Sequence, residues 1–242
     1  METRQFACIS GTDRGIGLAL VHELLQADYT VFAGGISPDL EQTMSGLAER
    51  FPGRLHPFQL DVGSDASVQE AAARIAEHTD TLDLLINNAA ILGETSATIT
   101  DKLDFDDIQR VFNVSAVGAL RLTHALIEPL LKGGKLIVNI SSEAGSIRNS
   151  HRQRWFGYSM AKAAMNMSST IIHNKIRSEG GRVLLLHPGW VKTSMGGQWS
   201  DEGTYTPEQS AAFIWQRIRE QGHEVHDQPL YIEADTGNAL PW

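Results

Sequence analysis

The sequence contains a single cysteine, Cys8, which lies in an apolar run near the N-terminus. One cysteine cannot form an intramolecular disulfide, and the lack of disulfides suits a reducing cytosol. We therefore expect a cytoplasmic protein in which Cys8 is a small core residue.

The sequence also lacks a long hydrophobic run. No uninterrupted apolar segment approaches the roughly 18 residues of a membrane span. Met1 leads within a few residues into a strand-like run, without the charged segment and apolar stretch of a signal peptide. We therefore expect no membrane partner and no targeting segment.

Positive charge is scarce, because 20 Lys and Arg stand against 29 Asp and Glu and give a net charge of -9. Nucleic acids and anionic membranes repel such a chain, so we expect neither as a partner. His223 and His226 are spaced in a way that metal sites sometimes use, but two histidines without a third ligand are weak evidence. We predict no metal site.

What the sequence does contain is an alternation of strand-like and helix-like segments over 242 residues, a length that fits one α/β domain. Strand-like runs lie at 6–10, 29–34, 55–60, 82–86, 135–142, 182–187 and 230–232. Helix-like segments lie at 18–25, 37–51, 64–79, 105–131, 158–177 and from 207 onward. The alternation predicts parallel strands joined by right-handed crossovers, in a single domain over residues 1–242.

Three glycines, Gly11, Gly15 and Gly17, stand between the first predicted strand and the first predicted helix. Their spacing, G-x-x-x-G-x-G, differs from the commoner G-x-G-x-x-G, but the physics is the same. Glycines let the backbone approach a pyrophosphate, and the helix N-terminus offers free N–H groups. The position favours a dinucleotide site over the alternative, a plain turn.

The second predicted strand ends at Gly34 and Gly35 without an acidic residue. An acid there would bind the adenosine ribose of NAD, and its absence leaves room for the 2′-phosphate of NADP. Arg14 and Ser37 could meet that phosphate. We therefore predict NADP(H) over NAD(H), with a merely solvent-exposed Arg14 as the alternative.

Tyr158 and Lys162 are four residues apart, so on a helix they share one face. A free tyrosine has a pKa of about 10, and an ammonium within ~4–6 Å lowers it by roughly 1–3 units. The pair, with the hydroxyl of Ser142 after an apolar run, indicates a tuned proton donor. A chance pair on a long helix is the alternative.

Polar residues also follow other predicted strands, where ligands bind in such sheets. Asp61 follows the third strand, and Asn87 and Asn88 follow the fourth. Asn113 lies among apolar residues of a helical segment, although asparagine is a mediocre helix former and is costly to bury unpaired. Its alternative role is a hydrogen bond to a neighbouring carbonyl.

These motifs together resemble the short-chain dehydrogenase/reductase family, in the family's order and over nearly the whole chain. The motifs are Gly11-x-x-x-Gly15-x-Gly17, Asp61, Asn87-Asn88-Ala89, Asn113, Ser142, Tyr158-x-x-x-Lys162 and Pro188-Gly189-x-Val191-x-Thr193. The segments around Trp155 and Trp190, together with the C-terminal Leu-Pro-Trp242, are most similar to the branch of C-factor and sniffer-like carbonyl reductases.

The resemblance implies a Rossmann fold, a doubly wound seven-stranded parallel sheet with helices on both faces. It implies hydride transfer between NADP(H) and a carbonyl or secondary-alcohol substrate. Tyr158 would be the general acid, Ser142 would bind the carbonyl oxygen, Lys162 would hold the nicotinamide ribose and lower the Tyr158 pKa, and Asn113 would hold a water near Lys162. Two donors aimed at the oxygen suit the negative charge that hydride transfer builds there.

The resemblance also implies the cofactor contacts. Asp61 would face the adenine, Asn87 and Ala89 the adenosine-side ribose, and Val191 and Thr193 the nicotinamide amide. The implied cofactor-binding residues are Gly11, Thr12, Asp13, Arg14, Gly15, Ile16, Gly17, Ser37, Asp61, Val62, Asn87, Asn88, Ala89, Tyr158, Lys162, Pro188, Gly189, Val191 and Thr193.

The sequence departs from the family pattern at two positions. Ala90 stands where the family usually has glycine, and its methyl group could narrow the cofactor cleft. Ile36 stands near where NADP-using relatives often place an arginine, so Arg14 is the one evident cation for a 2′-phosphate.

Two loops suggest further hypotheses. The loop between Ser142 and Tyr158 contains basic residues and could bind an anionic substrate, with a solvated loop or a subunit contact as the alternative. These residues are Arg148, His151, Arg152 and Arg154. The segment 196–206 could close over bound ligand as a lid, with Met195 and Trp199 as apolar covers; its alternative is a static surface loop.

Other function classes remain open. A catalytically silent dinucleotide-binding sensor on the same fold is the main alternative, although such a protein would be expected to lose Tyr158, Lys162 or Ser142. An epimerase or dehydratase shares the Tyr/Lys pair but usually adds a substrate domain. The family's usual subunit contacts, the helices near Asn113 and Tyr158, predict a homodimer or homotetramer.

Overall fold

The computed structural model describes residues 4–195, 197 and 199–242. Seven strands form one sheet in the order β3-β2-β1-β4-β5-β6-β7, and every neighbouring pair is parallel. The strands are β1 (Phe6–Ser10), β2 (Thr30–Gly35), β3 (Leu55–Gln59), β4 (Leu84–Asn87), β5 (Leu136–Ile140), β6 (Arg182–His187) and β7 (Leu230–Glu233). The prediction of a doubly wound, seven-stranded parallel sheet is confirmed.

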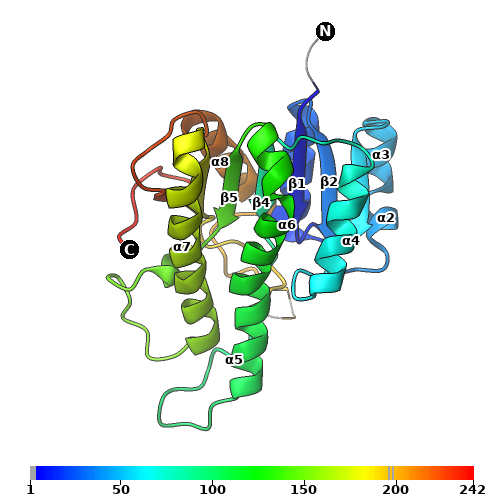
Figure 1. The fold of residues 1–242 in the computed structure, drawn as a ribbon. Coiled ribbons are helices and arrows are strands. Elements are labelled where there is room, and N and C mark those ends of the chain that lie inside the picture. The colour runs from blue at the N-terminus through cyan, green and yellow to red at the C-terminus, as the bar shows by residue number, and fades with distance from the viewer. Residues whose placement is uncertain (1–3, 196, 198) are drawn as a thin grey trace.

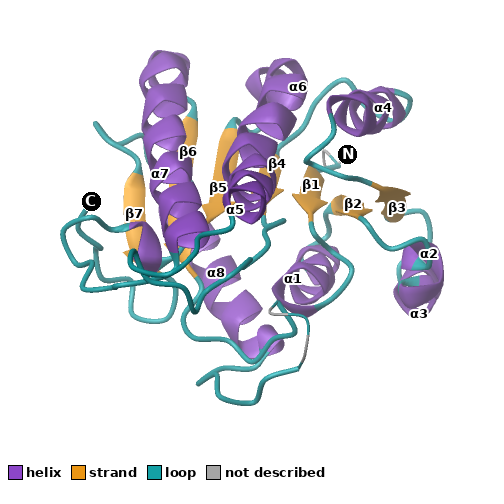
Figure 2. Ribbon diagram, turned by 90° about the horizontal axis from the view of Figure 1, so that it is seen from below, coloured by secondary structure: helices purple, strands orange, loops and turns teal. Residues whose placement is uncertain are grey.

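Helices cover both faces of the sheet (Figure 2). On one face lie α4, α5, α6 and α7, and on the other lie α1, α2, α3 and α8 (Figures 1 and 2). The helices are α1 (Gly15–Gln26), α2 (Leu40–Thr43), α3 (Ser45–Arg50), α4 (Asp65–Ala76), α5 (Phe105–Phe112), α6 (Gly118–Lys132), α7 (Phe156–Ile176) and α8 (Pro207–Gln221).

Strand order reverses between β1 and β4, because β2 and β3 extend to one side of β1 and β5 to β7 to the other. In open parallel sheets, ligands bind beyond the carboxyl ends of the strands at such a switch point. The turns after β1 and β4 therefore mark the expected cleft.

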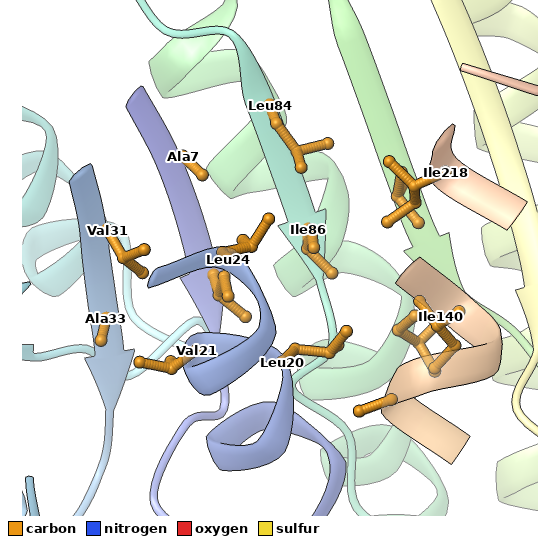
Figure 3. Close-up of a cluster of buried hydrophobic side chains, with 14 of the residues drawn as sticks. Ala7, Leu20, Val21, Leu24, Val31, Ala33, Leu84, Ile86, Ile140 and Ile218 are labelled. Carbon is orange, nitrogen blue, oxygen red and sulfur yellow. The ribbon is translucent and has the colours of Figure 1, made fainter. Parts of the chain in front are cut away.

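Each face of the sheet has its own apolar core. On the α1 side, Leu20, Val21 and Leu24 of α1 pack against β-strand residues such as Val31 and Ile86 (Figure 3). All of these side chains are buried, and each full burial contributes roughly 1.5–3 kcal/mol before the entropy cost is counted.

On the other face, Leu122, Leu126 and Leu130 of α6 pack against Leu85 and Ile137 of the sheet. By length and composition alone, the stretch Phe105–Lys132 could cross a membrane. Its buried leucines lie instead in the core under the sheet, which accounts for its apolar composition.

The structure corrects two predicted helices. The segment 37–51 is not one helix, because it breaks at Met44, whose side chain is fully buried, between α2 and α3. Gly46 in the next turn disfavours a continuous helix by about 1 kcal/mol relative to alanine. The segment 105–131 is interrupted by a π-helical turn, Asn113–Val117, a feature that often marks functional sites.

Candidate active site

The glycine loop has the geometry that its sequence predicts. Gly11 and Gly15 have positive φ angles of +71° and +58°, in the left-handed region that favours glycine. A Cβ atom on Gly17 would lie 2.0 Å from the carbonyl oxygen of Gly11. Above Gly15 a Cβ would meet no atom within 4 Å, so this side of the loop is open. An open backbone at a helix N-terminus fits the pyrophosphate of a dinucleotide.

The next two residues tie the loop to β2. Both the hydroxyl and the backbone N–H of Thr12 donate to the carbonyl oxygen of Gly34, at 3.0 and 3.1 Å. The Asp13 carboxylate accepts the N–H of Ser37 at 2.5 Å and that of Ile36 at 3.2 Å. The side chain of Asp13 is thus fixed at the carboxyl end of β2.

The turn after β4 is bound to the same loop. The Asn88 amide donates to the carbonyl oxygens of Ser10 and Gly11, at 3.1 and 2.8 Å, and the Ala89 N–H donates to the Ser10 hydroxyl at 3.2 Å. The Cβ position of Gly11 lies only 2.7 Å from the Ala89 Cα. The structure therefore brings these predicted cofactor residues together at the switch point.

Asn87 has a different placement from the one that the resemblance implies. Its amide is buried and donates to Thr123 at 3.0 Å and to Asn139 at 2.7 Å, and Asn139 in turn donates to Ser169 at 2.7 Å. Both amide hydrogens are therefore used inside the protein. The Asn87 amide nitrogen is engaged within the protein, and its two partners, Thr123 and Asn139, were not predicted from the sequence.

Asn113 is also turned away from its expected partner. Its amide nitrogen donates to the carbonyl oxygen of Gly63 at 3.0 Å, and its amide oxygen accepts from Arg121 at 3.1 Å. Both contacts lie beside the turn after β3, next to Asp61, and neither involves Lys162. That Asn113 holds a water near Lys162 stays a prediction, and these contacts give its side chain a second role beside Asp61.

Ser115, two residues further into the π-helical turn, was not singled out from the sequence. Its hydroxyl is fully buried, accepts the N–H of Ile91 at 3.0 Å and lies 3.3 Å from the Ile91 carbonyl oxygen. It therefore fixes the chain just after the β4 turn. A serine in an apolar helical segment gives no sequence signal for this role.

The three expected catalytic side chains do converge. Ser142, just beyond β5, lies close enough to the phenol of Tyr158 to lower its pKa. The Lys162 Nζ lies 5.5 Å from the centre of the Tyr158 ring and donates to the Ile140 carbonyl oxygen at 2.6 Å. Tyr158 and Lys162 lie one turn apart on α7, as their spacing predicts, and all three side chains are buried.

The protonation of this group differs from the expectation. Burial raises the pKa of Tyr158 to about 12, and Glu143 adds to the rise, while the Ser142 hydrogen bond and the Arg152 charge oppose it. Burial also lowers the pKa of Lys162 to about 7. The predicted lowering of the phenol pKa by Lys162 is therefore absent, because the ammonium is itself desolvated and bonded to Ile140. A raised pKa keeps the phenol protonated, as a proton donor requires.

A chain of contacts that the sequence did not predict surrounds Tyr158. Arg152 donates to both carboxylate oxygens of Glu143, at 3.0 and 2.5 Å, and lies 5.3 Å from the ring centre of Trp155. Trp155 packs edge-on against Tyr158, with ring centres 6.0 Å apart. On the far side, the Tyr231 hydroxyl donates to the Ser142 carbonyl oxygen at 2.5 Å. Arg152 is thus already paired with a carboxylate.

The remaining predicted cofactor residues follow the strands β3 and β6. Asp61 accepts the N–H of Gly63 at 2.8 Å. After β6, Gly189 has a φ of +82°, and Val191 and Thr193 pair with Tyr205 and Ser200 respectively. These pairings join residues of the expected lid to the segment just before it; Gly196, its first residue, and residue 198 lie outside the described residues.

Within 4–195, 197 and 199–242, no three His, Cys, Asp or Glu side chains gather as a metal site. His226 is 4.0 Å from Glu224, in the segment between α8 and β7.

Comparisons with known proteins bear on this arrangement. The chain matches the short chain dehydrogenase family over residues 5–203. It is similar to 1-hydroxy-2-glutathionyl-2-methyl-3-butene dehydrogenase of Rhodococcus sp. (strain AD45), with 30% identity over 235 residues, covering 97% of this chain and 98% of the relative. It is 38% identical over 120 residues to C-signal of Myxococcus xanthus, covering 49% of this chain and 71% of the relative.

Among solved structures, the NADPH-bound carbonyl reductase from chicken fatty liver has the same fold, with a TM-score of 0.86 and 30% identity. The match covers 100% of this chain and 96% of that one. The resemblance drawn from the motifs, including its link to C-factor and carbonyl reductases, is confirmed. The chain belongs to the short-chain dehydrogenase/reductase family of NAD(P)-dependent oxidoreductases.

Proposed function

We propose that this protein transfers a hydride between NADP(H) and a carbonyl or secondary-alcohol substrate, with Tyr158 as general acid in reduction and general base in oxidation. The observation that carries the proposal is the convergence of Ser142 and Lys162 on Tyr158, just beyond the carboxyl end of β5. Two hydroxyl donors at one point can bind a carbonyl oxygen as negative charge develops on it.

The residues of the chain then have distinct tasks. Ser142 and Tyr158 hold the substrate oxygen, and Tyr158 gives it a proton as the carbon–oxygen double bond is reduced. Lys162, buried and bonded to the Ile140 carbonyl, would position the phenol and bind a ribose hydroxyl. When bound, the nicotinamide cofactor supplies the hydride. The glycine loop, from Gly11 to Gly17, would hold its pyrophosphate.

The preference for NADP(H) over NAD(H) remains part of the proposal. It rests on the missing acid at the end of β2 and on Arg14, which is exposed beside the glycine loop. The chicken carbonyl reductase, by its description, binds NADPH, which supports the same choice. The carboxylate of Asp13 opposes it, because that group lies at the end of β2.

We also propose an anionic substrate, in a form that differs from the sequence-based hypothesis. Arg152 is neutralised by Glu143, so the exposed Arg154 carries the argument. It lines a surface hollow of about 600 Å³ together with Thr98, Thr100 and Ser150. The Rhodococcus relative is named for a glutathionyl substrate, and a glutathionyl group bears carboxylates.

The substrate proposal is tested with an acidic and a neutral carbonyl compound of the same size. Arg154→Ala should raise KM for the acidic compound alone, while Arg148→Ala, a neighbouring arginine outside the residues that line the hollow, should change neither. An equal change of KM for both compounds in Arg154→Ala would refute a charge-reading role.

A homodimer or homotetramer is proposed as well. On α7, Met160, Met167 and Ile171 are exposed, and Leu120 is exposed on the neighbouring α6; the two helices run side by side on one face (Figures 1 and 2). Light scattering after gel filtration should give at least twice the 26.5 kDa chain mass. The variant Met167→Glu with Ile171→Glu should give the chain mass, and a wild-type chain of 26.5 kDa would contradict an oligomer.

The experiment that decides the function is a carbonyl panel assayed with NADPH and with NADH. Turnover that Tyr158→Phe abolishes, while nucleotide binding persists, supports the oxidoreductase. Nucleotide binding by the wild type without turnover of any compound favours the catalytically silent sensor.

A further inference from the structure

The end of β2 contains a carboxylate that comes from another part of the chain. The last residues of β2 are glycines, and no acid follows directly. The Asp13 side chain from the glycine loop nevertheless accepts the N–H groups of Ile36 and Ser37, at 3.2 and 2.5 Å. A Cβ on Gly35 would lie 2.8 Å from either carboxylate oxygen, so the glycine makes room for this carboxylate.

This position matters because the adenosine ribose of a dinucleotide binds at the end of the second strand. An acid there accepts hydrogen bonds from the ribose hydroxyls of NAD and repels the 2′-phosphate of NADP. A 2′-phosphate also needs donors. The N–H groups of Ile36 and Ser37 are the backbone donors at this strand end, and Asp13 already occupies both.

We propose that Asp13 is a specificity-determining residue of the cofactor site: its carboxylate selects against a 2′-phosphate and takes the part of the missing acid of β2. The opposing group is Arg14, which is adjacent in sequence and exposed. The preference between NADP(H) and NAD(H) is then the balance of these two neighbouring charges. This inference rests on the proposed dinucleotide site.

The test measures binding without catalysis. Isothermal titration at pH about 7.5, where a phosphate monoester is close to dianionic, compares adenosine 2′,5′-bisphosphate with ADP, which lacks the 2′-phosphate. Asp13→Asn keeps the size of the side chain and removes its charge. We expect it to tighten binding of the 2′-phosphorylated ligand by about tenfold or more, with ADP changed less than about threefold.

The matched control is Asp39→Asn. Asp39 is exposed, lies two residues after Ser37, and its side chain makes no capping hydrogen bond to α2. Asp39→Asn removes one negative charge in the same region, as Asp13→Asn does, but it leaves the contacts of Asp13 with the Ile36 and Ser37 N–H groups in place. An equal shift in both variants would show a general charge effect and overturn the proposal.

Other outcomes are equally decisive. If Asp13→Asn fails to fold, Asp13→Ser removes the same charge with a smaller side chain that can still accept a hydrogen bond, and the same tightening is expected. Arg14→Ala should weaken the 2′-phosphorylated ligand selectively. An unchanged ratio of the two affinities in a folded Asp13 variant refutes the specificity role, whereas failure of the wild type to bind either ligand refutes the dinucleotide site itself.

Discussion

Arg152 forms a two-point hydrogen-bonded ion pair with Glu143, the residue that directly follows Ser142. The same guanidinium lies over Trp155, which packs against Tyr158. The pair therefore connects the loop that holds Ser142 to the start of the helix that holds Tyr158, the two hydroxyls proposed to be catalytic. Both partners are partly exposed, so the ion pair adds little to the free energy of unfolding. Its main effect is to fix the positions of the two segments.

The first prediction concerns this connection. Arg152→Ala should lower kcat by about tenfold with a smaller change in KM, because the contacts that fix Ser142 and Tyr158 relative to each other are lost. Arg152→Lys should recover part of the loss, and Arg154→Ala should leave kcat with a neutral carbonyl unchanged.

Since Glu143 raises the Tyr158 pKa and Arg152 lowers it, the pH profile of alcohol oxidation should move to lower pH in Glu143→Gln and to higher pH in Arg152→Ala. Coinciding pH profiles of the wild type and the two variants would contradict an influence of the Glu143–Arg152 pair on Tyr158.

The second prediction concerns the phenol. Tyr158→Phe should lower kcat for carbonyl reduction by about 10²–10⁴-fold, as expected for loss of a positioned general acid. Ser142→Ala should cost about 10²–10³-fold through loss of one oxygen-binding donor. Steady-state kinetics and nucleotide titrations measure both effects, and the affinity for NADPH should stay within about threefold in each variant. Tyr29→Phe is the control, because Tyr29 lies at the α1–α8 side of the sheet.

Lys162 gives the third prediction, on stability against pH. Burial lowers its pKa from 10.5 to about 7 in the folded state, so between these values the unfolded chain binds more protons. Stability should therefore rise with pH across this window, by up to about 1.4 kcal/mol per pH unit. Urea unfolding at pH 7, 8 and 9 measures the free energy of unfolding of the wild type and of Lys162→Met. The rise with pH should be present in the wild type and absent in Lys162→Met. Parallel slopes would mean that Lys162 is charged in the fold.

The sequence predicted features that are local and repeated in pattern. Glycines at a strand–helix junction and a Tyr/Lys pair one turn apart identify their own geometry, and the structure places Gly11, Gly15, Tyr158 and Lys162 as expected. The sequence could not show which way the Asn113 side chain points, because the π-helical turn that begins at this residue shifts the helix face.

Contacts between distant segments were also beyond the sequence. Asp13 reaches residues 23 and 24 positions away, and Asn87 pairs with Asn139 at a separation of 52. Such pairs have no periodicity that would reveal them. The fall in the Lys162 pKa likewise depends on burial, which only the assembled fold determines.

The fourth prediction concerns the buried amides beneath the cleft. Asn139→Ala removes the acceptor for Asn87 and the donor to Ser169, and should lower the free energy of unfolding by about 1–3 kcal/mol because buried polar groups lose their partners. Asn149→Ala, at an exposed loop position, should change it by less than about 0.5 kcal/mol. Urea unfolding compares the two variants. Equal free energies of unfolding would contradict a stabilising role for the hydrogen bonds among Asn87, Asn139 and Ser169.

The last prediction separates two roles for Asn113. A side chain in a proton relay would lower kcat when removed, whereas the contacts with Gly63 and Arg121 place it at the turn next to Asp61. Asn113→Ala should therefore weaken binding of ADP by about three- to tenfold, equivalent to one lost hydrogen bond, and leave the kcat at saturating cofactor within about threefold. Arg121→Met, which removes this contact together with those of Arg121 to Asp65 and the Val62 carbonyl, should also weaken ADP binding. A fall in kcat of a hundredfold with unchanged ADP affinity would instead contradict this role and favour the relay.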